Sequence, residues 1–305
     1  MSRLEEIETF LQIARSGSIS GAAGVLNIAK SAASRRLSEL EARLGVQLFH
    51  RTTRQLSLTD AGAAFRKRAE RVIDDLAEAE AEASEGNSAL SGALRVAAPL
   101  SFGLSELRCV LAGFACANPK VVMDVDFSDR RVDLVGEGFD IAVRIGELAD
   151  SSLVARRLCP IRAVAVASPK FWDAHGRPSH PRDLADLPCL RYSNVTRPGV
   201  IPYWGPGGES GAIEPPIRLL ANNGDFLTEV AVHGGGYLIE PTFLLYQHLR
   251  SGALEAVATA FEWSKSHLNV VYPPARQRSA RVRAFADAVI AKFHNNPYWD
   301  EGLGV

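Results

Sequence analysis

Short hydroxyl side chains and long cations share one face of a segment predicted to be helical, SAASRRLSELEARLG at residues 31–45. The opposite face carries Ala33, Leu37, Leu40 and Leu44 at steps of four, three and four, and this apolar face is expected to pack inward. The polar face carries the following side chains: Lys30, Ser31, Ser34, Arg35 and Ser38. Small hydroxyls beside cations let a second large body approach the helix axis closely. The surrounding stretch is locally basic, so the chemistry on offer is hydrogen bonding and charge pairing with an anionic partner.

Two shorter helices are expected ahead of this one. Residues 4–14 place apolar side chains on one face, Gly17 ends that helix, and Ser18 caps the next. The second helix runs to about Leu26 and is rich in glycine and alanine, which suits close contact with its neighbours. Two short helices, a tight turn and a third helix with a basic face predict a helix-turn-helix.

The segment VQLFHRTTRQLSLTDAG at residues 46–62 alternates around a polar tip, which predicts two short strands. Arg51, Thr53 and Arg54 lie at this tip. A hairpin of this kind standing alone is usually a solvated turn. Beside a helix-turn-helix it is a wing, whose arginines suit a phosphate backbone or a minor groove.

A long helix should follow the hairpin, capped by Thr59 and ending near Ala83. Its apolar positions, which include Phe65, Val72 and Leu76, keep coiled-coil spacing and leave a seam exposed in a monomer. The first half of this helix is basic and the second half acidic, so an antiparallel copy matches opposite charges. The sequence therefore predicts a homodimer held by this helix.

From residue 93 onward candidate strands and helices alternate, which predicts α/β structure with one or two mostly parallel sheets. Seven strand candidates stand out: ALRVAAP, VVMDVDF, DIAVRIG, RAVAVAS, IRLLAN, GYLIEP and HLNVVYP. Ligands of such folds bind at the carboxyl ends of strands. The expected organisation is a mainly α winged helix-turn-helix over 1–59, a linker helix and hinge over 60–92, and an α/β domain over 93–305.

Composition limits the alternatives. The chain has 305 residues and a net charge of −1, so its overall charge indicates no partner. We find no signal peptide and no apolar run of membrane-spanning length, so we expect a cytoplasmic protein without a membrane partner. The four cysteines form no C-x-x-C pair, which fits a reducing compartment. The histidines lack metal-ligand spacing, and we expect neither a metal nor a cofactor.

The first 60 residues resemble the winged helix-turn-helix of LysR-type transcriptional regulators, through the run FLQIARSGSISGAAGVLNIAKSAASRRLSELEARLGVQLFHRTTRQLSLTDAG. The run departs from the family at Ala29 and Lys30, where a hydroxyl residue followed by glutamine is common. The resemblance implies that double-stranded DNA faces the third helix, with an operator of approximate twofold symmetry. Base edges would then meet Lys30, Ser31, Ser34 and Arg35, and phosphates would meet Arg36, Arg51, Thr53 and Arg54.

The remainder resembles the family's effector-binding domain, which is itself similar to type 2 periplasmic binding proteins. PLSFG, SDRRVDLVGEGFDIAVRIGELADSSLVARRL and HPRDLADLPCLRYS resemble the branch that contains CrgA- and AaeR-like regulators. The resemblance implies two α/β subdomains, one at about 93–160 and 268–297 and the other at about 161–267. It also implies a small-molecule effector in the cleft between them and a dimer or a tetramer.

The residues favour a small anionic effector. Ser101 follows the first strand of this domain and opens a helix, so its hydroxyl and the neighbouring amides can hold a carboxylate. Arg144 ends another strand and supplies either charge for the ligand or a structural ion pair. Trp204 offers an aromatic wall or is ordinary core. The candidate effector-binding residues are Ser101, Phe102, Arg144, Ser193, Asn194, Tyr203, Trp204 and Asn222.

Two other classes of protein compete with this interpretation. HGGG at residues 233–236 is similar to the oxyanion-hole segment of α/β-hydrolase esterases, but the chain lacks the G-x-S-x-G elbow that such enzymes need. Its nearest match, GESGA at 208–212, ends in alanine and precedes the histidine. A small-molecule-binding protein of a transporter would need export. We therefore expect a binding protein and not an enzyme.

Overall fold

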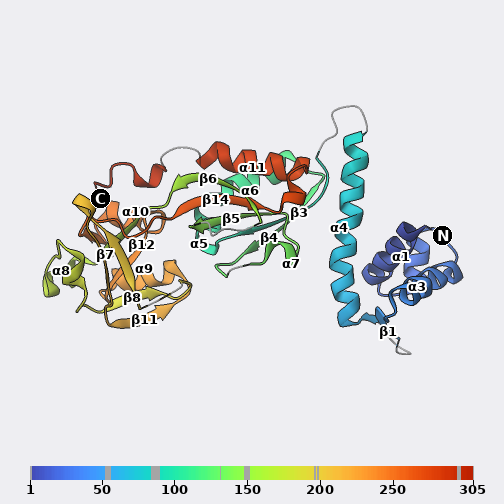
Figure 1. Ribbon diagram of the computed structural model, residues 1–305, viewed down its shortest axis with the longest axis horizontal. Coiled ribbons are helices and arrows are strands. Elements are labelled where there is room, and N and C mark those ends of the chain that lie inside the picture. Colours follow the sequence, from blue (N-terminus) through green and yellow to red (C-terminus); the bar gives the residue numbers. More distant parts are fainter. Residues whose placement is uncertain are drawn as a thin grey trace. The chain divides into compact units, whose positions relative to one another are not determined.

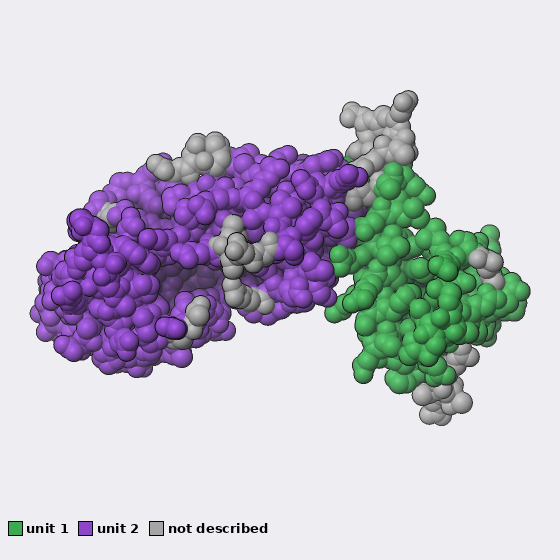
Figure 2. Space-filling view, in the orientation of Figure 1, with its two compact units in different colours: residues 1–92 green, residues 93–305 purple. Residues whose placement is uncertain are grey.

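The structure is a computed structural model that describes residues 2–304 apart from 52–55, 84–89, 131, 148–151, 196, 198 and 294–296. The chain divides into two compact units, Met1–Gly92 and Ala93–Val305, called unit 1 and unit 2 here (Figure 2). Unit 1 is mainly helical, whereas unit 2 contains two five-stranded sheets (Figure 1).

Unit 1 consists of helices and one hairpin: α1 (Arg3–Ser16), α2 (Ile19–Val25), α3 (Lys30–Leu44), β1 (Phe49–Arg51), β2 (Leu56–Leu58) and α4 (Asp60–Ala83). The predicted caps are present. Gly17 ends α1 with φ of 68°, a left-handed conformation that favours glycine. The Ser18 hydroxyl accepts a hydrogen bond from the Gly21 amide at 3.0 Å and caps α2. At the start of α3, the N-cap residue Ala29 has extended backbone but makes no side-chain cap.

The helices of unit 1 close around an aromatic core. The Phe10 side chain is fully buried, and its ring lies 5.4 Å from that of Phe49 and 5.2 Å from that of Phe65. The Glu41 carboxylate accepts a hydrogen bond from the Leu48 amide at 2.8 Å, which ties the entry of the hairpin to α3. These contacts fix the hairpin beside the third helix, as in a winged helix-turn-helix.

The apolar seam of α4 is covered by the core of unit 1 at its start and exposed further along, whereas the sequence predicted a seam exposed along the whole helix. Phe65 and Ala69 pack into the core of unit 1, because α4 covers an edge of α1 that the shorter helices leave open. Val72 and Leu76 remain exposed, at 52% and 37% respectively. The exposed apolar surface of this helix therefore begins after its third turn.

Unit 2 has two lobes, each built on one sheet. The first lobe has strand order β4-β3-β5-β14-β6, and the second has β11-β8-β12-β7-β13. The strands of the first lobe are β3 (Gly92–Ala98), β4 (Val121–Phe127), β5 (Ile141–Gly146), β6 (Val154–Pro160) and β14 (His267–Tyr272). Those of the second are β7 (Ala163–Ala167), β8 (Cys189–Tyr192), β11 (Ile217–Ala221), β12 (Tyr237–Pro241) and β13 (Glu255–Val257). A separate hairpin pairs β9 (Ile201–Trp204) with β10 (Ser210–Ile213).

Helices cover both sheets. The first lobe has α5 (Leu100–Phe102), the π-helix η1 (Gly103–Leu107), α6 (Arg108–Ala117), α7 (Leu134–Glu137), the 3₁₀ turn η4 (Pro274–Arg276) and α11 (Ala280–Phe293). The second has α8 (Pro169–His175), the 3₁₀ turns η2 (Pro181–Leu184) and η3 (Pro206–Gly208), α9 (Gly224–Val232) and α10 (Thr242–Ser251). A last 3₁₀ turn, η5 (Tyr298–Asp300), follows α11.

Both sheets are mixed, which corrects the expectation of mostly parallel sheets. In the first lobe β3 runs parallel to β5, but β14 runs antiparallel to both β5 and β6. In the second lobe β12 runs parallel to β8 and antiparallel to β7. The reason is the path of the chain, which crosses to the second lobe after β6 and returns through β14. The two crossings meet where the Ile161 amide donates to the Ser266 carbonyl at 2.9 Å.

The run Leu100–Ala117 is the one helical segment among the described residues with the length and mean hydropathy, 1.4, of a membrane span. It is interrupted by η1 and packs within the first lobe. Leu107, Leu111 and Phe114 are buried, and the Phe114 ring lies 5.3 Å from that of Phe285 on α11. This segment is an amphipathic helical run that packs one face against the first lobe.

The turn η5 holds both lobes together away from the sheets. Trp299 is fully buried, with its ring 5.9 Å from Phe102 of the first lobe and 6.2 Å from Phe243 of the second. The Tyr298 hydroxyl donates to the buried Glu106 carboxylate on η1. Arg250 on α10 donates to the Glu301 carbonyl at 3.0 Å.

Candidate DNA-binding face and ligand cleft

Helix α3 has one buried apolar face and one exposed polar face. Ala33, Leu37 and Leu40 are fully buried on the inner face. On the outer face Lys30, Ser31 and Arg35 are exposed, and Ser34 is half-buried. The Arg35 side chain is 65% exposed, and its nearest acid, Glu39, lies 3.9 Å away on the same helix. This guanidinium is therefore available to a partner molecule.

Arg36 has a different environment. Its guanidinium lies 3.2 Å from the Glu5 carboxylate and donates to the Thr9 hydroxyl at 3.5 Å, both on α1. Only 17% of the side chain is exposed. Arg36 therefore joins α3 to α1 within unit 1. From the sequence we expected it to contact a phosphate, and residue type and spacing alone did not indicate this structural role.

The predicted wing is partly described. Phe49 pairs with Leu58 and Arg51 with Leu56, so β1 and β2 form the antiparallel hairpin that the alternation predicted. Thr53 and Arg54 lie outside the described residues, as does the side chain of Arg51.

In unit 2, Ser101 lies where the two lobes meet. Ser101 belongs to the first lobe, and the residue is 9% exposed. Its hydroxyl donates to the Asp225 carboxylate of the second lobe at 2.5 Å. The Leu100 amide donates to the Asp129 carboxylate at 2.9 Å. The Asn194 side chain of the second lobe donates to the Asp129 carbonyl at 3.4 Å, so a second hydrogen bond spans the lobes. Figure 2 shows the surface of unit 2 hollowed between its lobes.

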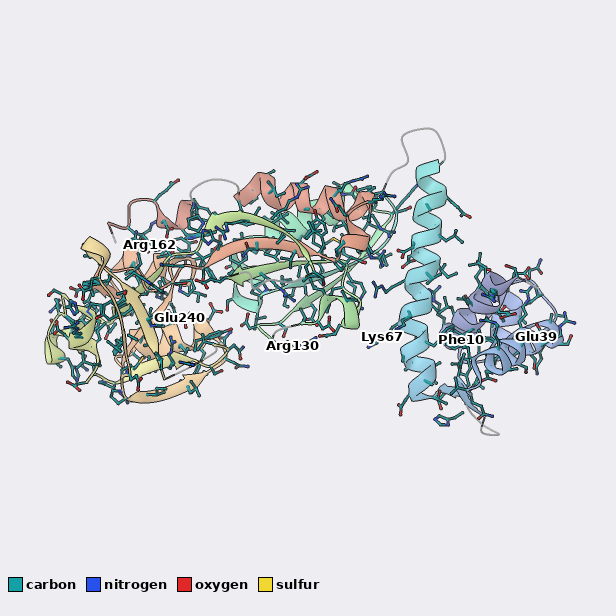
Figure 3. All side chains as sticks on the ribbon, viewed as in Figure 1. Phe10, Glu39, Lys67, Arg130, Arg162 and Glu240 are labelled. Carbon is teal, nitrogen blue, oxygen red and sulfur yellow. The ribbon has the colours of Figure 1, made fainter. Side chains whose placement is uncertain are left out.

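Glu240 is an acid in the wall of the second lobe, and Figure 3 labels it. Burial, together with the smaller effect of the nearby charges of Asp129 and Asp225, raises the pKa of Glu240 to about 8. The Arg191 guanidinium opposes this rise, while burial lowers the pKa of Arg191 itself. At neutral pH the Glu240 carboxyl is therefore protonated and can donate a hydrogen bond.

The other candidate residues for the effector divide into four groups, the last of which is the aromatic pair Tyr203 and Trp204. Phe102 is fully buried among Phe243, Phe293 and Trp299, so it forms core behind Ser101. Arg144 donates to the Val132 carbonyl and ties β5 to the loop before α7. Ser193 and Asn222 follow β8 and β11 at the same edge of one sheet.

Tyr203 and Trp204 lie in the β9–β10 hairpin. Tyr203 is buried and its ring packs against Phe261 and Trp263. The ring of Trp204 lies 4.4 Å from the Lys265 ammonium group. Among the described residues, no hydrogen bond or ring contact joins this hairpin to Ser101. Ser101 and Asn194 thus each form a hydrogen bond between the lobes, whereas Tyr203 and Trp204 lie in a hairpin that makes no such bond to Ser101.

Three acids of the cleft, Asp129, Asp225 and Glu240, were not among the predicted residues. Each follows or ends a candidate strand, and Asp225 lies in the polar run after β11. Their positions at strand ends were therefore visible in the sequence, but an anionic ligand predicts hydrogen-bond donors and cations around it, not acids.

The HGGG run has a structural role. His233 ends α9, and its ring bonds to the Glu229 carbonyl at 2.9 Å. Gly236 has φ of 151° and its backbone passes so close to Pro188 that an added Cβ would lie 2.7 Å from the Pro188 carbonyl. The glycines thus turn the chain tightly from α9 into β12.

A winged helix-turn-helix domain, here called the head, followed by a two-lobed α/β domain is the domain combination of a DNA-binding regulator with a ligand-binding domain. Residues 4–63 match the bacterial regulatory helix-turn-helix protein of the lysR family, and residues 87–294 match the LysR substrate binding domain. The chain belongs to the LysR family of transcriptional regulators, which are not enzymes.

Relatives match along nearly the whole chain. The regulator CrgA of Neisseria meningitidis (serogroup C, strain 8013) is 34% identical over 296 residues, which cover 96% of this chain and 97% of CrgA. DmlR of Escherichia coli (strain K12) is 30% identical over 282 residues, covering 92% and 91%. The solved CrgA structure matches with a TM-score of 0.60 at 33% identity, covering 95% and 99%. Full-length AphB of Vibrio cholerae shares the fold, with a TM-score of 0.59 at 24% identity, covering 97% and 100%.

Proposed function

We propose that this LysR-type regulator reads a double-stranded operator of approximate twofold symmetry with the exposed face of α3. The division of α3 into a buried apolar face and a polar face with an unburied Arg35 carries this proposal. Arg35 can donate two hydrogen bonds to guanine, and Ser31 and Ser34 can pair with several base edges. Lys30, Arg51, Thr53 and Arg54 add contacts to bases or phosphates at the rim.

Two copies of the chain place two heads on such an operator. The exposed Val72 and Leu76 on α4 support a homodimer through this helix, because a monomer leaves both in water. A tetramer would join two such dimers. The regulator acts in the cytoplasm, where its DNA is.

The effector in this proposal is a small anionic metabolite bound between the lobes of unit 2. Ser101 already donates to a carboxylate, the protonated Glu240 can donate a second hydrogen bond, and Arg191 supplies a half-buried positive charge. These donors suit a carboxylate better than a neutral ligand. Because a ligand acts through its different affinities for two conformations, closing the lobes must change the spacing of the heads.

The DNA-binding part is tested by gel shift with the DNA upstream of the protein's own gene. Binding should be sequence-specific, weaken steeply with salt, and protect two related half-sites from cleavage. Binding that does not distinguish this DNA from a scrambled duplex would refute the proposal.

The effector part is tested by a thermal-shift screen of small carboxylates with the full chain. For a carboxylate that stabilises the wild type, Ser101→Ala should weaken binding and leave ligand-free operator affinity nearly unchanged. Equal affinity in the wild type and in Ser101→Ala would move the site elsewhere.

A further inference from the structure

The hydrogen bond between Ser101 and Asp225 is an unusual link between the lobes, because its acceptor is a carboxylate of the protein itself. Asp225 stands in the first turn of α9 and remains an exposed residue, so solvent and small anions can reach it. Among the described residues, Ser101 is the one side-chain hydrogen-bond partner of Asp225. The contact thus places an acid group where the effector's acid group is expected.

Asp225 is the acid in the first turn of α9, where its charge suits the helix N-terminus, but it does not cap the helix. The cap of α9 is provided by Asn223, whose side chain accepts from the Phe226 amide at 2.8 Å. Gly224 presses the start of α9 onto α10, since an added Cβ would lie 2.6 Å from the Leu244 side chain. This close approach fixes the first turn and directs Asp225 toward the first lobe.

The charges around the hydrogen bond between Ser101 and Asp225 weaken it, so that another carboxylate can take the place of Asp225. Asp225 and Asp129 approach Glu240 from opposite lobes, and the negative charges of both disfavour ionisation of the Glu240 carboxyl. Closing the lobes through Asp225 therefore gathers the negative charges of Asp129 and Asp225 around one carboxyl, which costs free energy. A ligand carboxylate could take the Ser101 hydroxyl and let Asp225 return to water.

We propose that Asp225 is a built-in occupant of the effector position: it holds the cleft closed in the ligand-free protein, and a ligand carboxylate replaces it at Ser101. This inference rests on the proposed function only for the place of the effector. It predicts that the ligand competes with a side chain of the protein and that Asp225 sets the ligand concentration at which the regulator responds.

The test is chemical rescue of the full chain. Asp225→Ala removes the carboxylate and leaves a gap that formate or acetate can fill. We expect formate, compared with chloride at equal ionic strength, to raise the melting temperature of unit 2 in Asp225→Ala by about 2–4 °C. The wild type, whose Ser101 is occupied, should gain clearly less. The double variant Ser101→Ala/Asp225→Ala should gain no more than the wild type.

A matched control is Glu229→Ala, which removes an exposed acid from the same helix and should behave like the wild type. Asp225→Asn, which keeps the shape of the side chain, replaces Asp225→Ala if the latter does not fold; an anion should bind it more tightly than the wild type. Equal stabilisation of the wild type, Asp225→Ala and the double variant would overturn the inference. Since neither DNA nor the effector is used, such a failure leaves the proposed regulator untouched.

Discussion

The Glu240 carboxyl should make the stability of unit 2 depend on pH. Its pKa is raised from 4.5 to about 8 in the folded protein. Between these values the unfolded chain has released a proton that the folded chain still holds, so stability falls as the pH rises through this window. Glu240→Gln should remove a loss on the order of a few kcal/mol. Urea unfolding followed by tryptophan fluorescence at pH 5, 7 and 8.5 measures this, because all four tryptophans lie in unit 2.

Glu229→Gln serves as the control for that series, because this acid is exposed and should leave the pH profile of the wild type intact. A Glu240→Gln profile as steep as that of the wild type would show that another group causes the dependence.

Arg35 and Arg36 are neighbours with opposite roles. Arg35→Ala should cost about 1–3 kcal/mol of operator binding and relax base preference at one position, with folding unchanged. Arg36→Ala should instead lower the melting temperature of unit 1, because it leaves the interface between α1 and α3 without its ion pair to Glu5. Gel shifts on a mapped operator and on single-base variants, with circular dichroism of both proteins, separate these effects. The assignment fails if Arg35→Ala leaves affinity and preference unchanged.

At the level of elements, the start of α3 can be strengthened. Ala29 has the extended backbone of an N-cap, with ψ of 142°, but lacks an oxygen to accept the first amides of the helix. Ala29→Ser should therefore stabilise unit 1 by about 0.5–2 kcal/mol. Thermal unfolding by circular dichroism measures the gain, with Ala29→Val as a control that adds bulk but no acceptor. An equal gain in both variants would rule out capping as the cause.

The covered and the exposed parts of the α4 seam make separate predictions. Leu76→Glu places a charge in the exposed seam and should shift the protein toward monomer and abolish tight operator binding. Phe65→Ala removes a ring from the core of unit 1 and should destabilise that unit by about 3–5 kcal/mol while the protein that remains folded keeps its oligomeric state. Light scattering and circular dichroism distinguish the two outcomes. A Leu76→Glu protein with the wild-type mass would contradict the seam.

The elements of unit 1 could be predicted from sequence because their signals are local. Gly17, Ser18 and Thr59 each form the cap or stop that the residue type indicated. In unit 2, β6 escaped prediction because its arginines break the apolar pattern, although it lies at a sheet edge where such side chains reach water. Strand order and direction depend on pairings between distant segments, which residue patterns do not encode. The link from Ser101 to Asp225, across more than a hundred residues, escaped for the same reason.

For the whole molecule, η5 should control how firmly the lobes are joined. Trp299→Ala removes a buried ring shared by both lobes and should cost about 3–5 kcal/mol in the unfolding of unit 2. Tyr298→Phe is the milder variant, because it only deprives the buried Glu106 of its donor, at about 1–3 kcal/mol. Hydrogen exchange should rise on both α5 and α10. Faster exchange confined to one lobe would show that η5 belongs to that lobe alone.

The chain enters the second lobe after Pro160 and leaves it before His267, and the two crossings lie side by side at the bond between Ile161 and Ser266. One uninterrupted stretch of the gene therefore encodes one entire wall of the cleft. A recombination event with both breakpoints at these crossings would exchange the second lobe between two related genes and retain unit 1, including α4, and the lobe that carries Ser101. Such hybrids must match the two crossings and the contacts of η5 with α10. Such an exchange would change the ligand specificity of the regulator and leave the residues that are proposed to contact DNA unchanged.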